Sequence, residues 1–300
     1  MSILLLAAIA AIALGLKPQW ALEGYFAALR WQAGAHETRV VVGDDLMAQL
    51  EAGPADAPLV VLLHGFTGAK ENFLPLMAEL TPKYRVVAPD LPGWGESTRR
   101  AGADYGVVAQ SERISAWLKT LPRAPELLVG HSMGGHIGAL VAANHPEQVT
   151  RLALMSSAGV PFNENAFARS VLEGGHPFAV TDRASFDAYM GLVFTDPPFV
   201  PWPVDRAFIA RRIADHDFEV AVLDRMRGDD VFAVQPLLAR IQAPVLLLWC
   251  DDDRVIDSSA AEAYAAGLGN SRTVLLKGCG HMPMVADAPE TAATLSAALK

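Results

Sequence analysis

The sequence carries the motif GHSMG at residues 130–134, directly after an apolar run at residues 127–129. A strand that passes through such a motif into a helix makes a sharp turn, and the turn presents the central serine as a nucleophile. Glycine is favoured on both sides of the serine because a side chain there would obstruct the close crossing of strand and helix. Residues 133–145 are apolar almost throughout and end before Pro146, as expected of the helix that follows. We therefore predict that Ser132 is a nucleophile in acyl transfer.

A serine nucleophile requires a general base, a carboxylate that orients the base, and N–H donors for the oxyanion. His281 lies in a Gly-Cys-Gly-His segment after the last apolar run, so it is the candidate base. The order expected for this motif is serine, acid, histidine, which places the acid between the two. Four aspartates close to the apolar run 244–249 are the candidate acids: Asp251, Asp252, Asp253 and Asp257. For His64 and His131, which lie within other motifs, we expect the backbone to matter more than the ring.

The chain has 300 residues, enough for one large domain or for a core with an insertion. Its residues are 52% hydrophobic and 19% charged, which is typical of a globular protein. The net charge of −9 disfavours binding to nucleic acid or to an anionic membrane through charge. The sequence has neither a GxxxxGK[ST] phosphate loop nor an HExxH zinc motif, and we predict no metal and no organic cofactor.

The candidate residues must be held by elements that alternate between apolar runs, typical of buried strands, and helical segments. The expected strands are residues 59–63, 85–88, 127–129, 151–155, 244–249 and 273–276, and the expected helices are residues 71–80, 105–121, 133–145, 260–268 and 288–299. A hairpin is expected at residues 38–50, with Gly43 in its turn. This alternation predicts an α/β fold with a parallel sheet.

The alternation stops between residues 158 and 238, where helical pieces rich in Phe, Pro and Met occur without a strand pattern. We interpret this interval as a helical cap inserted above the sheet. The predicted organisation is an amino-terminal apolar segment at 1–33, the first part of the core at 34–157, the cap at 158–238 and the second part of the core at 239–300.

The two cysteines, Cys250 and Cys279, stand beside the candidate acid and base. We expect them to be isolated buried residues, because a buried cysteine usually acts as a small hydrophobe. Their expected position at the ends of two neighbouring strands would still permit a disulfide in an oxidising compartment.

Five segments in this order resemble the α/β-hydrolase superfamily, and the resemblance runs from about residue 40 to the carboxyl terminus. They are HGF at 64–66, DLPGWGES at 90–97, GHSMGG at 130–135, WCDDDRV at 249–255 and GHMP at 280–283. Within the superfamily, the pattern is similar to monoacylglycerol-lipase-like enzymes and related bacterial lipases and esterases. The resemblance implies a mostly parallel sheet of about eight strands with helices on both faces. This sequence departs from the family pattern at Cys250, where family members usually have glycine.

The resemblance also implies site residues. Among the four aspartates it favours Asp253, which would accept the Nδ1 proton of His281. The backbone N–H groups of Phe66 and Met133 would stabilise the oxyanion. For Asp251, Asp252 and Asp257 we expect ordinary solvated loop charges.

The aromatic content of the cap favours an apolar pocket for an acyl chain. Five residues are the candidate pocket residues: Trp94, Phe162, Met190, Phe194 and Met282.

We predict a serine carboxylic ester hydrolase that acts on acylglycerols, with monoacylglycerol first among them, or on medium-chain esters. The expected partner is a small lipid or ester substrate rather than nucleic acid, and the sequence does not predict an oligomeric state. The alternatives are a hydrolase that cleaves carbon–carbon bonds in aromatic ring-fission products, and a non-catalytic membrane-associated binding protein on the same fold.

Residues 3–16 form an unbroken run of apolar residues and glycine, which is short for a transmembrane helix of about 20 residues. Residues 20–31 then contain several aromatic side chains of the kind found at membrane interfaces. We predict that residues 1–33 are an uncleaved membrane-associating segment, in a bacterium at the inner membrane. The alternatives are a helix that packs on the protein's own surface, and a secreted, periplasmic or soluble cytoplasmic protein.

Overall fold

A single eight-stranded sheet organises the computed structural model, which describes residues 15 and 17–299. The strand order is β1-β2-β4-β3-β5-β6-β7-β8. The strands are β1 (His36–Val42), β2 (Asp45–Ala52), β3 (Leu59–Leu63), β4 (Arg85–Pro89), β5 (Leu127–His131), β6 (Leu152–Met155), β7 (Val245–Cys250) and β8 (Ser271–Leu276). Only the pairs β1–β2 and β2–β4 are antiparallel. The predicted mostly parallel sheet is confirmed, including the hairpin, in which Gly43 adopts a φ of 59°.

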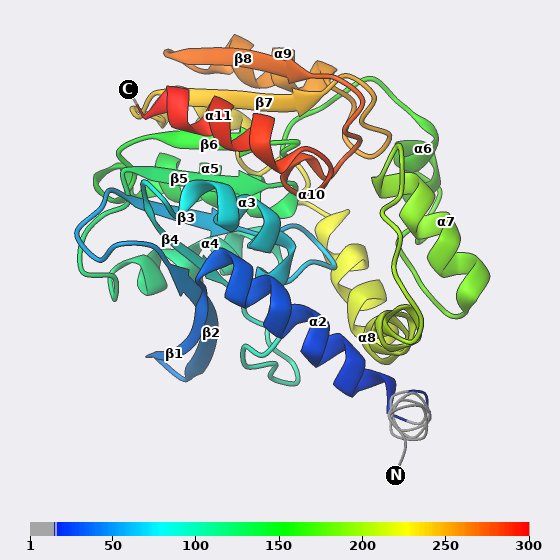
Figure 1. Cartoon of the computed structure of the whole chain (residues 1–300). Coiled ribbons are helices and arrows are strands. Elements are labelled where there is room, and N and C mark those ends of the chain that lie inside the picture. Colours follow the sequence, from blue (N-terminus) through cyan, green and yellow to red (C-terminus); the bar gives the residue numbers. More distant parts are fainter. Residues whose placement is uncertain (1–14, 16, 300) are drawn as a thin grey trace.

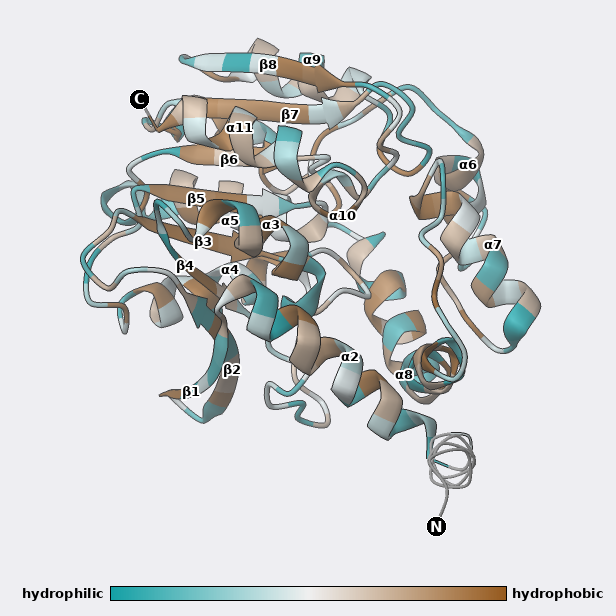
Figure 2. Cartoon of the chain, viewed as in Figure 1, coloured by the Kyte–Doolittle hydropathy of each residue, from teal (hydrophilic) through white to brown (hydrophobic). Residues whose placement is uncertain are grey.

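The central strands are apolar because both faces of the sheet are covered. Every residue of β3, β5, β6 and β7 is buried, and Figure 2 shows these strands as a continuous hydrophobic layer. Helices α2 (Pro18–Ala33), α3 (Leu74–Leu80), α10 (Pro283–Ala286) and α11 (Ala288–Ala298) lie over one face, and α4 (Val107–Leu118), α5 (Met133–Asn144) and α9 (Ser259–Gly267) lie over the other (Figure 1). Short 3₁₀ helices η1 (Lys70–Phe73) and η2 (Pro146–Gln148) complete the core.

The connection between β6 and β7, all of whose residues are described, contains helices and no strand: α6 (Ala166–Leu172), α7 (Arg183–Val193), α8 (Val204–Met226) and η3 (Gln235–Arg240). Helices α6, α7 and α8 lie beyond the carboxyl ends of the parallel strands, the edge where ligands bind in α/β sheets (Figure 1). Two of these helices have side-chain N-caps. The side chain of Asn165 accepts a hydrogen bond from the N–H of Ala168 in α6, and that of Asp182 accepts one from the N–H of Ser185 in α7.

Helix α2 packs against α3 and α8 (Figure 1). Leu22 and Phe26 are buried, and the ring of Phe26 meets the ring of Phe208 edge-on at 5.7 Å. On the other side of the helix, Trp20 is 56% exposed and Trp31 is 86% exposed. The aromatic segment is therefore divided between the protein's own surface and solvent. Within the described residues no helix is long and apolar enough to cross a membrane, and the apolar run 3–16 lies outside them apart from Gly15.

Candidate active site

The turn between β5 and α5 holds Ser132 in an unusual backbone conformation, with φ at 53° and ψ at −119°. A side chain added at Gly130 would place its Cβ 2.3 Å from the carbonyl oxygen of Gly134. A Cβ at Gly134 would lie 2.4 Å from the carbonyl oxygens of Leu63 and His64. Real structures do not contain contacts this short, so glycine is required at both positions. The motif thus determines the turn that raises the serine above the sheet.

The backbone N–H groups of Phe66 and Met133 donate no hydrogen bond to any described residue. Met133 is the first residue of α5, where helix geometry leaves N–H groups unpaired and the helix dipole favours a negative charge. Phe66 follows β3, and β3 pairs in parallel with β5. Both N–H groups therefore lie at the same edge of the sheet, beside the turn that carries Ser132.

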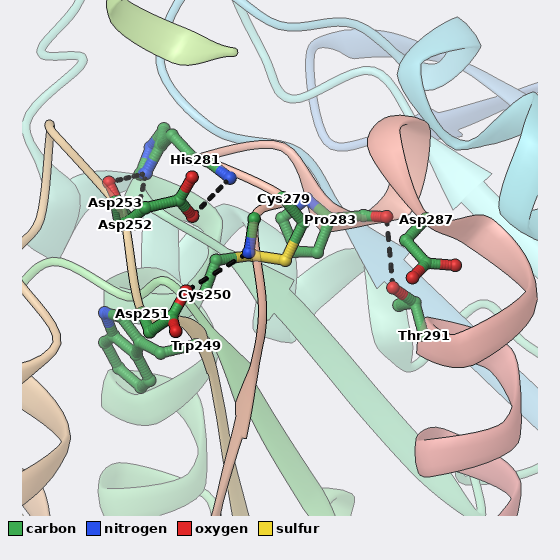
Figure 3. The surroundings of a disulfide bond; sticks show 12 residues. Trp249, Cys250, Asp251, Asp252, Asp253, Cys279, His281, Pro283, Asp287 and Thr291 are labelled. Carbon is green, nitrogen blue, oxygen red and sulfur yellow. Dashed lines mark hydrogen bonds and ion pairs between the residues drawn. A yellow bond between two sulfur atoms is a disulfide. The ribbon is translucent and has the colours of Figure 1, made fainter. Parts of the chain in front are cut away.

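Asp253 and His281 form a buried pair at the carboxyl end of β7 (Figure 3). The Nδ1 atom of His281 lies 2.9 Å from Oδ2 and 3.1 Å from Oδ1 of Asp253. The same carboxylate accepts hydrogen bonds from the backbone N–H groups of Val255 (2.9 Å) and Ile256 (3.0 Å), which fix its orientation. Because Nδ1–H donates to the carboxylate, the proton of the neutral ring stays on Nδ1, and the lone pair of Nε2 is free to accept a proton.

His131 connects this pair to the serine turn. Its Nε2–H donates to the carbonyl oxygen of His281 (2.7 Å), and the two rings lie 4.8 Å apart. Burial, together with His281, lowers the pKa of His131 well below its usual value, so the ring stays neutral. Since Ser132 follows His131 directly, His281 lies beside the serine turn. No hydrogen bond between the side chains of Ser132 and His281 is present among the described residues. Hydrogen bonds between a nucleophile and its base often form only when substrate is bound.

The sequence did not predict a structural role for the imidazole ring of His131, nor for that of His64. The Nδ1–H of His64 donates to the carbonyl oxygen of Gly65 (2.8 Å), and its Nε2 accepts from the N–H of Leu91 (2.9 Å). The ring therefore ties the loop after β3 to the loop after β4. The only signal in the sequence for either role is the position of the histidine between an apolar run and a glycine: His131 ends β5, and His64 directly follows β3.

A buried ion pair joins the same two loops. Lys70 and Asp90 are fully buried, with 2.9 Å between Nζ and Oδ2, and Asp90 also accepts from the backbone N–H of Lys70 (2.8 Å). Glu71 completes the cluster at 2.9 Å from Nζ. Separating Lys70 from Asp90 would leave an uncompensated buried charge, which is costly. The pair therefore restricts movement of the loop that carries Phe66. Sequence analysis did not single out any of these three residues.

Asp251 is exposed and Asp252 is half-buried, and each also accepts a backbone hydrogen bond that the sequence did not predict. Asp251 accepts a hydrogen bond from the N–H of Gly278 (3.1 Å), and Asp252 accepts one from the N–H of Gly280 (3.0 Å) (Figure 3). Burial alone would raise the pKa of Asp252, but hydrogen bonds from the Thr195 hydroxyl and Gly280 lower it. The two carboxylates hold the loop that carries His281. Asp257 instead accepts from the N–H of Ser259 at the start of α9.

Cys250 and Cys279 form a disulfide, so the expectation of two isolated thiols was wrong (Figure 3). Strands β7 and β8 are neighbours in the sheet, and their ends bring the two Cα atoms to 5.5 Å. Both residues are buried. The bridge joins the strand that leads to Asp253 with the loop that leads to His281.

A cavity of about 210 Å³ lies between α2, the loops after β3 and β4, and helices α7 and α8. Four of the five candidate pocket residues line it: Trp94, Met190, Phe194 and Met282. Phe162 is not among the described residues that line it, because the hydrogen bond from the N–H of Asn163 to Ser259 holds its segment against α9. Helix α2 contributes three lining residues that sequence analysis did not include: Tyr25, Phe26 and Leu29.

Comparisons with known proteins agree with this architecture. A model described as the alpha/beta hydrolase family matches residues 60–294. Lipase 1 of Psychrobacter immobilis is 31% identical over 253 residues, which cover 83% of this chain and 78% of that protein. Monoacylglycerol lipase ABHD6 of Bos taurus is 28% identical over 253 residues, covering 81% of this chain and 75% of that protein. The crystal structure of a membrane phospholipase A, described as a novel bacterial virulence factor, is 37% identical with a TM-score of 0.92 and covers 99% of this chain and 96% of that chain.

Proposed function

The chain belongs to the alpha/beta hydrolase family, as its motifs predicted, and on this premise we propose that it is a serine carboxylic ester hydrolase acting on acylglycerols, monoacylglycerol first among them, or on medium-chain esters. The observation that carries the proposal is the buried Asp253–His281 pair beside the Ser132 turn, with two backbone N–H groups at the same edge that donate to no described residue. Lipases among the relatives support the same class of reaction.

In the proposed mechanism, the Ser132 hydroxyl attacks the ester carbonyl while His281 Nε2 takes its proton. Asp253 stabilises the imidazolium through Nδ1–H. The N–H groups of Phe66 and Met133 donate to the tetrahedral oxyanion. The intermediate collapses to an acyl-enzyme as His281 protonates the leaving alcohol, and water activated by the same ring then releases the acid.

An acyl substrate is supported by the aromatic and aliphatic side chains that dominate the cavity beside this site. Phe186, Met190, Phe194, Phe208 and Val285 all line it. A cavity of this composition removes apolar surface of an acyl chain from water, which is the main source of affinity for such a ligand.

We extend the proposal to membrane association through residues 1–33. It is supported by the apolar run 3–16 and by the similarity to a membrane phospholipase A. Two exposed aromatic residues of the connection between β6 and β7 also support it: Phe199 lines the cavity and is 89% exposed, and Trp202 lies against Gly15 and is 56% exposed. Aromatic side chains of this kind favour a membrane interface. The Cys250–Cys279 bridge favours the oxidising side of that membrane.

The proposed activity is tested with p-nitrophenyl esters of graded acyl length, monoacylglycerols and a ring-fission dienoate. We expect the highest kcat/KM for medium-chain esters and monoacylglycerols, because the cavity is apolar and of limited volume. The dienoate should react at least 100-fold more slowly, as an order-of-magnitude expectation from the preference of apolar pockets. A faster reaction with the dienoate than with every ester would contradict the proposal and favour carbon–carbon bond hydrolysis.

A further inference from the structure

One face of α8 brings charged side chains into a cavity that is lined mainly by apolar residues. Five residues of this helix line it: Phe208, Arg211, Arg212, Asp215 and Glu219. Their spacing of three, four and seven positions places them on a common face of the helix. Charged residues are rarely buried without a partner, so their position beside a substrate cavity requires an explanation.

Arg212 and Glu219 form a nearly dry ion pair at the cavity wall. Nη2 of Arg212 lies 2.9 Å from Oε2 of Glu219, and the two residues are only 8% and 4% exposed. The same nitrogen donates to the carbonyl oxygen of Phe178 (2.8 Å). The guanidinium also lies 4.4 Å from the ring centre of Tyr189. Arg212 is thus held in one orientation by three independent contacts.

These contacts leave part of the guanidinium without an acceptor. All its hydrogen bonds to described residues are made by Nη2. The buried Nε has no partner among the described residues, and Nη1 donates to none of them. A guanidinium offers five N–H donors, so unused donors remain on a fixed group that lines the cavity.

Short contacts connect this group to the loop that carries Phe66. The hydroxyl of Tyr189 lies 3.4 Å from Oγ1 of Thr67, the residue after Phe66. The ring of Phe178, whose carbonyl oxygen Arg212 holds, lies 5.7 Å from the ring of Phe66. Tyr189 and Phe178 therefore each contact both Arg212 and the loop that carries Phe66. Because only one residue lies between them, a bound ester with its carbonyl at that loop could place its polar part beside Arg212.

The charges around the cavity indicate which polar group fits. The lining contains two cations, Arg211 and Arg212, and three carboxylates, those of Glu71, Asp215 and Glu219. Burial raises the pKa of Glu219 to about 7 even though Arg212 opposes that shift. Each of these carboxylates already has a cationic partner, because Asp215 pairs with Arg99 and Glu71 pairs with Lys70, as Glu219 does with Arg212. A neutral hydroxyl or ester oxygen adds no charge to this set and needs only a donor, which the unused N–H groups of Arg212 supply.

We propose that Arg212, held by Glu219, donates hydrogen bonds to the neutral glycerol head of the substrate and thereby sets a preference for acylglycerols over esters that lack hydroxyl groups. This inference rests on the proposed ester hydrolase function and names the alcohol that it accepts. Arg212 has a role in specificity here, and the chemical step is left to the groups at the serine turn.

The test compares kcat/KM for 1-monolauroylglycerol, methyl laurate and the anionic 1-lauroylglycerol 3-phosphate. Because a lone Arg212→Met change would leave Glu219 buried without its partner, the main variant is the double change Arg212→Met with Glu219→Met. Such a replacement of a buried pair by apolar residues usually keeps the fold, which circular dichroism verifies. Arg206→Met, on the exposed side of α8, is the matched control.

The expected result is a loss of about 10- to 100-fold in kcat/KM for monolauroylglycerol in the double variant, the size of a lost hydrogen bond to a charged donor. Methyl laurate should change less than about threefold, and Arg206→Met should behave as the wild type. Equal losses for both neutral esters would overturn the inference by showing a purely structural role, and so would a larger loss for the phosphate ester. If the wild type hydrolyses none of the three, the proposed function itself fails and this inference fails with it.

Discussion

Replacing Asp253 by asparagine is expected to lower kcat for ester hydrolysis by about 10⁴-fold, the loss typical of this change at the acid of a serine triad. The carboxylate accepts a hydrogen bond from the Nδ1–H of His281, whereas an amide NH₂ group would donate to Nδ1 and hold the ring in the wrong tautomer. The fold should persist, because an amide oxygen can still accept the hydrogen bonds from Val255 and Ile256.

Asp251→Asn and Asp252→Asn are the matched controls, since each removes one charge from the same loop. Each amide oxygen can still accept the hydrogen bond from Gly278 or Gly280, so we expect activity within about tenfold of the wild type. The measurement is kcat on one medium-chain p-nitrophenyl ester at saturating concentration. A greater loss in either control than in Asp253→Asn would move the acid to that position.

Replacing both Cys250 and Cys279 by serine is expected to lower the free energy of unfolding by about 3–4 kcal/mol, the chain-entropy value for a loop of this length. The bridge joins two residues that are 29 positions apart, and both are buried. Without it, the loop that carries His281 keeps the hydrogen bonds from Gly278 and Gly280 to the two aspartates, but the unfolded chain gains freedom.

Urea unfolding of the oxidised wild type, the reduced wild type and the double variant measures this effect. Reduced wild type should resemble the double variant, and thiol titration of the unfolded, unreduced wild type should find no free thiol. Two free thiols in that titration, or an unchanged midpoint in the double variant, would contradict the assignment.

The local geometry of the serine turn could be predicted from the sequence because steric limits act within a few residues. Glycine is needed at position 130 because β5 and α5 cross there, with a Cβ 2.3 Å from the carbonyl oxygen of Gly134. It is needed at position 134 because α5 also approaches the end of β3, with a Cβ 2.4 Å from a carbonyl oxygen. The strands were equally predictable, since a parallel sheet covered on both faces requires nearly continuous apolar runs.

The features that escaped prediction depend on contacts between distant segments. The hydrogen bond from His131 to His281 joins residues 150 positions apart, and the Lys70–Asp90 pair forms where two loops meet at the sheet edge. The packing of α2 on α8 and the charged inner face of α8 likewise depend on how the insertion lies over the sheet. No local pattern encodes that placement.

The central claim is that Ser132 forms a covalent intermediate, and active-site labelling tests it most directly. The protein is treated with a fluorophosphonate probe, digested and mapped by mass spectrometry, with Ser132→Ala as the control. We predict one label per chain on the peptide that contains Ser132, loss of ester hydrolysis in proportion to labelling, and neither labelling nor hydrolysis above background in the alanine variant. Labelling of a different residue, or ester hydrolysis retained by folded Ser132→Ala protein, would contradict the account.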